Sequence, residues 1–282
     1  MSALAVRAWT FKDRVERSGD GDWRASQRAE REYNRRLRLV SNEVGRIINF
    51  PSDPRQKEAL LLQYAEQLAP WADYAATQMI EAVGVKSAKQ WRQALNKIHR
   101  PNASPSDQLA ALRAKRALLE DVTRQSLAMA NSLRQELSGP LGLIINQQIK
   151  DNADLIKSIP RDAASGVADR VRRGLVNGER PEDISKSIQE ESSIAAWRAD
   201  TIARTETSKA QSILTQARAQ SIGSESYIWH TSSDGNVRPS HADMNGKPVS
   251  WSNPPTLDGM TGHAGEFPNC RCYAEPIIPN DW

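Results

Sequence analysis

Residues 229–251 read WHTSSDGNVRPSHADMNGKPVSW, and residues 267–272 read FPNCRC. Three of the four histidines and both cysteines lie between positions 229 and 272. Helical signals fill most of the chain before this stretch and are absent within it, where Gly, Pro, Ser, Asn and Asp favour turns. The sequence therefore predicts a turn-rich C-terminal unit that follows a long helical body.

The length and composition suit an extended protein better than a single globule. The 282 residues are enough for one large domain or two smaller ones. A hydrophobic content of 39% is low for one compact core and suits helices with narrow apolar faces. We predict an α+β protein in which an elongated, mainly helical N-terminal region precedes a small C-terminal α+β lobe. The predicted domains are a flexible lead-in over residues 1–22, a helical region over 23–159 and the lobe over 160–282.

The net charge of +4 is unevenly distributed. Six basic and eight acidic residues follow position 200, so the helical body carries the positive excess. No basic start followed by an apolar run marks a signal peptide, and no run reaches the ~18 apolar residues of a membrane span. The two cysteines are two positions apart, too close for an unstrained disulfide. These features predict a cytosolic chain without membrane contact.

Proline positions and hydrophobic spacing predict the secondary structure. The expected helices of the body cover residues 23–49, 55–68, 71–83, 87–98, 106–137 and 141–159. Further helices are expected over 163–176, from Pro181 onward, and over 193–220. Strands are expected over 225–231 and 272–278. Long helices with short connections predict a helical hairpin or bundle.

The helix expected over residues 23–49 has two distinct faces. Apolar residues at helical spacing form one of them: Tyr33, Leu37, Val40, Val44 and Ile47. Arginines project on the other: Arg24, Arg28, Arg31, Arg35, Arg38 and Arg46. The bland interpretation is a solvent-exposed face on which Glu30, Glu32 and Glu43 reduce the repulsion between the arginines. The functional interpretation is a surface that contacts DNA phosphates or an acidic partner, with a steep salt dependence.

Several motifs in the C-terminal half resemble a known family. They are Ile202-Ala203-Arg204-Thr205-Glu206, then Trp229, Asp234, Arg238, His241 and Gly246, and last Pro268-Asn269-Cys270-Arg271-Cys272. In this order they resemble the C-terminal domain of phage Mu F-like minor head proteins, the tailed-phage head morphogenesis proteins. The resemblance covers residues 159–278, a little under half of the chain. Phe267 stands where some members have histidine.

The resemblance implies a role in the virion. It implies a minor capsid protein that acts in head morphogenesis near the portal, and in DNA packaging or ejection. The implied partners are the portal protein, scaffold or capsid proteins, and packaged DNA. The implied location is the interior of the phage head, with assembly in the host cytoplasm. The resemblance implies neither an enzyme nor a cofactor.

The histidines and cysteines leave a metal site open. A structural zinc would take thiolates from Cys270 and Cys272, with His241 and either His263 or His230 completing the ligands. On a regular strand the two cysteine Cα atoms lie about 6.6 Å apart, so sharing one metal requires a local bend. The alternatives are small buried cysteines within a core, and redox chemistry.

The polar motif residues also have two interpretations. As a structural clamp, Arg204 and Glu206 hold the long helix against the lobe, while Asp234, Arg238 and His241 bond across the turn-rich loop. As a catalytic site, His241 acts with an aspartate as acid and base, and Arg204 holds an anion. That site would suit a zinc-dependent hydrolase or nuclease, or an ADP-ribosyltransferase-like enzyme. The sequence lacks a Gly-rich phosphate loop and a nucleophile elbow, which favours the clamp and a protein that is not an enzyme.

Overall fold

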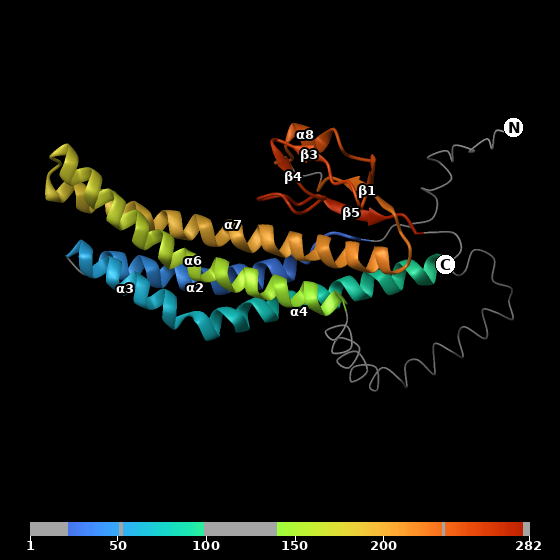
Figure 1. Ribbon diagram of the computed structural model, residues 1–282, viewed down its shortest axis with the longest axis horizontal. Coiled ribbons are helices and arrows are strands. Elements are labelled where there is room, and N and C mark those ends of the chain that lie inside the picture. Colours follow the sequence, from blue (N-terminus) through green and yellow to red (C-terminus); the bar gives the residue numbers. More distant parts are fainter. Residues whose placement is uncertain (1–21, 51–52, 99–139, 233–234, 279–282) are drawn as a thin grey trace, which may run out of the picture.

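The computed structural model describes residues 22–50, 53–98, 140–232 and 235–278. Within these ranges, long helices form an elongated body, and a small group of strands lies against one side of it (Figure 1). The predicted α+β class is therefore confirmed. The helix predicted over 106–137 and nearly all of the predicted lead-in lie outside the described residues.

The helical body is organised around two long antiparallel helices. The helices of the described ranges are α2 (Gln27–Asn49), α3 (Pro54–Gln67), α4 (Ala69–Ile98), α6 (Pro140–Asn177) and α7 (Pro181–Ser221). A short turn joins α6 to α7, and the two pack along each other as a hairpin (Figure 1). The α2 helix packs along α7, and α3 packs along α6. A helical hairpin is what the short connections predict.

Helix α2 has the two faces that its sequence predicts. Its N-terminus is capped by Ser26, whose hydroxyl accepts a hydrogen bond from the Ala29 amide. All five apolar residues of the predicted stripe are buried. The helix begins at Gln27 rather than at residue 23, because the capping serine ends the preceding extended segment. Arg24 therefore precedes the helix, while the other five arginines of the predicted face lie on it and are exposed.

Two predicted helix breaks are absent from the structure. The helices predicted over 71–83 and 87–98 are one continuous helix, α4, and those predicted over 141–159 and 163–176 are both part of α6. Pro160 lies inside α6, where a proline costs about 3 kcal/mol. Two isoleucines beside it, Ile156 and Ile159, are buried and each contribute about 1.5–3 kcal/mol, which offsets that cost.

The helix α7 also runs past a predicted boundary. Residues 181–192 and 193–220 form one helix with Pro181 in its first turn, as expected for proline. Acidic residues in that turn, Glu182 and Asp183, complement the helix dipole.

The lobe is built on a three-stranded antiparallel sheet. Strand β1 (Ser226–His230) lies between β2 (Pro248–Ser250) and β5 (Tyr273–Pro276). Its register pairs Trp229 with Ala274. A single helical turn, α8 (Pro239–Ala242), and a small hairpin of β3 (Thr256–Leu257) and β4 (Met260–Thr261) complete the lobe. Strands β1 and β5 lie within the two strands predicted, and β2, β3 and β4 have no counterpart in that prediction.

Two hydrophobic clusters hold these parts together. One runs through the helical body, and the other fills the lobe around Tyr227, Trp229 and Trp251. Trp23 and Trp91, which come from the helical body, belong to the lobe cluster and stack edge-on with ring centroids 5.0 Å apart. The lobe is therefore anchored by the segment before α2 and by α4, in addition to α7. Among the described helices, none has an apolar stretch sufficient to span a membrane.

Candidate metal and anion site in the lobe

His241 is held at the centre of the lobe by α8. Arg238 precedes this helical turn and Pro239 opens it, which fixes the backbone for the turn that carries the imidazole. The side chain is buried, with only 2% of its surface exposed. The rings of Trp229 and Phe267 pack against it, with centroids at 5.6 and 4.8 Å. Aromatic packing on this scale leaves the imidazole little freedom to change its orientation.

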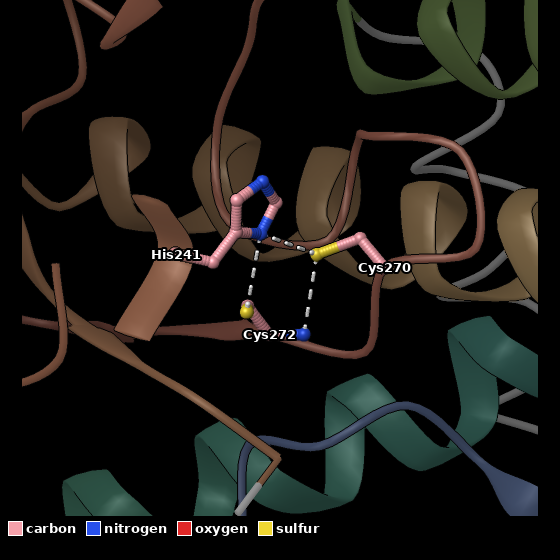
Figure 2. A group of neighbouring side chains, drawn as sticks. All are labelled: His241, Cys270 and Cys272. Atoms are coloured by element: carbon pink, nitrogen blue, oxygen red, sulfur yellow. Dashed lines mark hydrogen bonds between the residues drawn. The ribbon is translucent and has the colours of Figure 1, made fainter. Parts of the chain in front are cut away.

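The two cysteines are brought to His241 by a tight turn ahead of β5. The Cys270 amide donates to the Phe267 carbonyl, and Asn269 has a left-handed backbone with φ of 57°. The Sγ atoms of Cys270 and Cys272 lie 3.5 and 3.6 Å from His241 Nδ1 (Figure 2). All three potential ligand atoms lie within 4.8 Å of one another. The turn thus supplies the local bend that a shared metal requires.

The two thiols are electrostatically unlike. A hydrogen bond with Cys272 lowers the pKa of Cys270 to about 6, and backbone hydrogen bonds from Cys272 and Gly265 act in the same direction. The hydrogen bond with Cys270, burial and the Cys270 charge raise the pKa of Cys272. One of the two thiols therefore ionises readily, but both can be thiolates at once only if a cation lies beside them.

A cavity of about 310 Å³ opens beside this cluster. Its lining includes His241, Cys270 and Cys272. Three arginines, Arg204, Arg238 and Arg271, also line it. All three are held by hydrogen bonds: Arg238 Nη2 donates to the Pro268 carbonyl at 2.8 Å, Arg204 Nη1 to Asn269 Oδ1 at 3.3 Å, and Arg271 Nη2 to Glu30 Oε1 at 3.2 Å. Arginine side chains gathered in this way favour an anionic group in the cavity.

The predicted clamp residues do not all meet. Arg204 on α7 reaches the cysteine turn through Asn269. Thr205, which the clamp prediction left out, accepts a hydrogen bond from the Asn269 amide at 2.9 Å. Asp234 lies outside the described residues. Arg204 and Thr205 therefore join α7 to the cysteine turn, and Arg238 and His241 act within the lobe.

The Glu206 side chain points into the helical body and not toward the lobe, as the clamp prediction requires. Its carboxylate accepts a hydrogen bond from Asn152 of α6 at 3.3 Å, and Asn152 in turn accepts one from the Tyr33 hydroxyl. Residues two apart on a helix point in different directions, so Arg204 and Glu206 cannot both reach the lobe. The prediction that Glu206 clamps α7 to the lobe is wrong: its hydrogen bond joins α7 to α6 in the helical body.

We expect Glu206→Gln to raise the melting temperature at neutral pH. Burial raises the pKa of the Glu206 carboxyl above its ordinary value of 4.5, against an opposing effect of Lys209. A carboxyl with a raised folded-state pKa favours folding below its ordinary value, and that contribution is lost as pH rises through the folded value. The amide keeps the contact with Asn152 and has no charge to desolvate. Melting curves between about pH 4 and pH 8 are expected to show the variant's advantage growing with pH.

The matched control for this experiment is Glu32→Gln. Glu32 lies on α2, where a hydrogen bond from Arg35 lowers the pKa of its carboxyl. Its replacement is expected to have a small effect that is opposite in sign. A Glu206→Gln variant that melts below the wild-type chain at neutral pH would show that the buried charge is required.

The other two histidines of the lobe, His230 and His263, lie elsewhere in it, and His99 lies outside the described residues. The Tyr227 hydroxyl is 3.3 Å from His263 Nδ1, and Trp251 packs against the His263 ring. His230 Nε2 lies 2.6 Å from a carboxylate oxygen of Glu275. Neither belongs to the cluster formed by His241, Cys270 and Cys272. The candidate ligand His263 is therefore not brought to the cysteines, because it packs against Tyr227 and Trp251, whereas His241 packs against Trp229 and Phe267.

Comparison with known proteins identifies the part of the chain that contains this site. Residues 165–275 match the family described as "Phage Mu protein F like protein". This range contains the end of α6, all of α7 and the lobe through most of β5. Residues 165–275 are thus similar to the phage Mu F-like family. The match confirms the resemblance seen in the sequence motifs and supports a phage head morphogenesis protein.

Two curated proteins are similar to part of this chain. An uncharacterized protein of Haemophilus influenzae is 35% identical over 137 residues, which is 49% of this chain and 30% of that protein. The NAD(+)--arginine ADP-ribosyltransferase EFV of Enterococcus faecalis is 31% identical over 128 residues, 42% of this chain and 26% of that protein. The aligned regions thus span less than a third of either relative. No solved structure matches the chain.

Proposed function

We propose that this chain is a minor head protein of a tailed bacteriophage that acts at the portal during head morphogenesis. In this proposal it stays in the head interior near the portal, after assembly with scaffold or capsid proteins in the host cytoplasm, and takes part in DNA packaging or ejection. The observation that carries the proposal is the Mu F-like match over residues 165–275. We propose a docking and assembly role without catalysis.

The shape of the helical body supports a docking role. The turn between α6 and α7 forms one end of the elongated body, away from the lobe (Figure 1). Two apolar side chains at this turn, Leu175 and Val176, are 71% and 81% exposed. Exposed apolar side chains at the end of a rigid element are suited to insertion into a partner's groove. We propose that this hairpin tip, Leu175 and Val176, contacts the portal.

The test is co-purification with the portal from infected cells. The Leu175→Glu/Val176→Glu double variant is expected to weaken portal binding roughly 10- to 100-fold, because two apolar anchors become charged. Its melting temperature should stay near that of the wild-type chain, since both side chains are exposed. Leu39→Glu, at a site on α2 that is 59% exposed, is the matched control and should bind the portal normally.

Two results would contradict parts of this proposal. Normal portal binding by the double variant would remove the hairpin tip from the interface. Failure of the wild-type chain to co-purify with the portal, together with its absence from purified heads, would overturn the portal role itself. Counting copies per head by quantitative mass spectrometry distinguishes a minor protein from a shell component.

The arginine face of α2 supports at most a weak contact with DNA. Four of the six arginines predicted for this face form ion pairs with carboxylates: Arg24, which precedes α2, with Asp22, and on α2 Arg35 with Glu32, Arg38 with Asp200 and Arg46 with Glu43. Arg28 and Arg31 are exposed and form no ion pair within the described residues. Glu32 and Glu43 pair with this face as the bland interpretation expects, whereas Glu30 pairs with Arg271. Arg28 and Arg31 are left for phosphate contacts.

If Arg28 and Arg31 contact DNA, binding should depend only moderately on salt. Two neutralised phosphates correspond to a log–log slope of roughly −2, compared with about −5 for all six arginines. The Arg28→Glu/Arg31→Glu variant should abolish that slope, while Arg35→Glu should leave it nearly unchanged. Equal binding by the double variant and the wild-type chain, measured by fluorescence anisotropy across salt concentrations, would exclude this DNA contact.

The enzyme alternative has less support in the site. The relative named as an ADP-ribosyltransferase shares only 26% of its length with the aligned region, so its activity is not transferred to this chain. Arg204 lies at the lobe cavity, whereas Glu206 is buried against Asn152 in the helical body. An active site that requires both residues on one substrate is therefore not formed.

A further inference from the structure

We propose that His241, Cys270 and Cys272 bind one zinc ion through Nδ1 and the two sulfurs, with the fourth coordination position open to the arginine-lined cavity. This inference does not rest on the proposed role in the phage head. It rests on the arrangement of three buried side chains from two separate segments of the lobe (Figure 2). Two cysteines and one histidine with an open fourth position are an established zinc ligand set.

The distances between the ligand atoms agree with tetrahedral coordination. Zinc bonds of about 2.3 Å to sulfur and about 2.0 to 2.1 Å to nitrogen, at the tetrahedral angle, place nitrogen and sulfur about 3.6 Å apart. The observed separations from His241 Nδ1 are 3.5 Å to Cys270 Sγ and 3.6 Å to Cys272 Sγ. The protein therefore already holds two edges of a coordination tetrahedron at the lengths that zinc requires.

Hydrogen bonding alone accounts poorly for this arrangement. A neutral imidazole has a single acceptor lone pair, and two thiols pointing at the same nitrogen compete for it. A metal ion shared by the three atoms uses that lone pair and both sulfurs together. The Cys272 amide also donates to Cys270 Sγ at 3.4 Å, and such a bond favours the thiolate form that binds metals.

The other nitrogen of His241 supports the same assignment. Nε2 is buried and has no hydrogen-bond partner among the described residues. It belongs to a ring packed against Trp229 and Phe267, whose electron-rich faces tolerate an N–H better than a lone pair. With the proton on Nε2, the lone pair lies on Nδ1, facing both sulfurs. Metal-bound histidines usually donate this N–H to an oxygen, so we expect moderate rather than extreme affinity.

Charge balance explains why the site has two cysteines. Zinc binds both sulfurs as thiolates, so any proton that a thiol still holds is released to solvent, and the two sulfurs neutralise the charge of the ion. Zinc is also the second cation that allows both cysteines to be ionised at once. The guanidinium groups of Arg204, Arg238 and Arg271 then face a fourth ligand that is water or a small anion.

The test begins with metal analysis of the full chain, reduced and dialysed against zinc. We expect about one equivalent of zinc in the wild-type chain, and less than about one tenth in Cys270→Ser, Cys272→Ser and His241→Gln. His230→Gln replaces a histidine of the same lobe outside the cluster and should retain the full equivalent. Chelation should lower the melting temperature of the wild-type chain and leave that of the cysteine variants unchanged.

Cobalt substitution keeps the test decisive if the variants fail to fold. The chain has only two cysteines, so a thiolate-to-cobalt charge-transfer band must come from Cys270 and Cys272. We expect that band together with the intense visible bands of tetrahedral cobalt, and a shift of the visible bands when azide is added. An unchanged spectrum in azide would overturn the open fourth position. Absence of both zinc and the thiolate band from the folded wild-type chain, or full zinc retention by folded Cys270→Ser, would overturn the site.

Discussion

Gly265→Ala is expected to lower the free energy of unfolding by about 2–5 kcal/mol. Gly265 has a backbone φ of 93°, a region that L side chains rarely adopt. A Cβ built there would lie 3.0 Å from the Cys272 carbonyl oxygen and 3.2 Å from that of Ser208 on α7. Both neighbours are backbone atoms, so relief requires moving the cysteine turn or the lobe itself. Chemical denaturation followed by tryptophan fluorescence measures the effect, because the lobe core contains Trp229 and Trp251.

Gly246→Ala is the matched control for this change. Gly246 also has a positive φ, of 77°, and has no atom within 4 Å of the position of a Cβ. It should incur only the backbone strain, about 1–2 kcal/mol. The difference between the two variants isolates the close approach of Gly265 to α7 and to the cysteine turn. Equal destabilisation by both variants would mean that the lobe can shift on α7 at little cost.

Sequence reasoning located the chemistry of the lobe because that chemistry is carried by rare residues. Both cysteines and His241 are in the turn-rich stretch, and the requirement for a local bend follows from strand geometry alone. Which histidine lies beside the cysteines depends on tertiary structure. The pairing of β1 with β5 brings the cysteine turn close to Trp229, against which His241 packs. Strand pairing between distant segments is not encoded in local spacing.

Helix boundaries were predicted less well, for a physical reason. Proline and glycine indicate breaks through local costs of about 1–3 kcal/mol. Burial of neighbouring side chains against other helices offsets such costs, as around Pro160 in α6, and it depends on contacts far along the chain. The apolar stripe of α2 was predicted correctly because one periodic pattern determined both its helix and its buried face.

The polar side chains of α7 also show what local spacing predicts and what it leaves open. The spacing of Arg204 and Glu206 establishes that they diverge, but it does not say which of them faces the lobe. The structure answers this through Asn269 on one side and Asn152 on the other. Likewise, nothing in the local sequence connects Trp23 and Trp91 with the lobe core. Local sequence patterns do not determine the contacts between segments that are distant in sequence.

Arg170→Ala is expected to destabilise the α6–α7 hairpin by about 3–5 kcal/mol. Arg170 Nε donates to Glu191 Oε1 at 2.5 Å, and Arg170 Nη1 lies 3.0 Å from a carboxylate oxygen of Glu190. The Glu191 side chain is only 8% exposed, so removal of the arginine leaves a buried carboxylate without its cation. The pair lies below the hairpin tip, so the variant should also weaken portal binding if the proposed docking through Leu175 and Val176 holds.

A surface pair on the same helix separates burial from charge in this experiment. Arg172 pairs with Asp169, with side chains that are 73% and 50% exposed, so Arg172→Ala should cost no more than about 1 kcal/mol. The double variant Arg170→Met/Glu191→Gln should recover most of the stability lost in Arg170→Ala, because no unpaired buried charge remains. Unfolding free energies from urea titrations provide the comparison. If Arg170→Ala and Arg172→Ala lower the free energy of unfolding equally, water must reach the Glu191 carboxylate. The hairpin would then be stabilised by its apolar contacts and not by the Arg170–Glu191 ion pair.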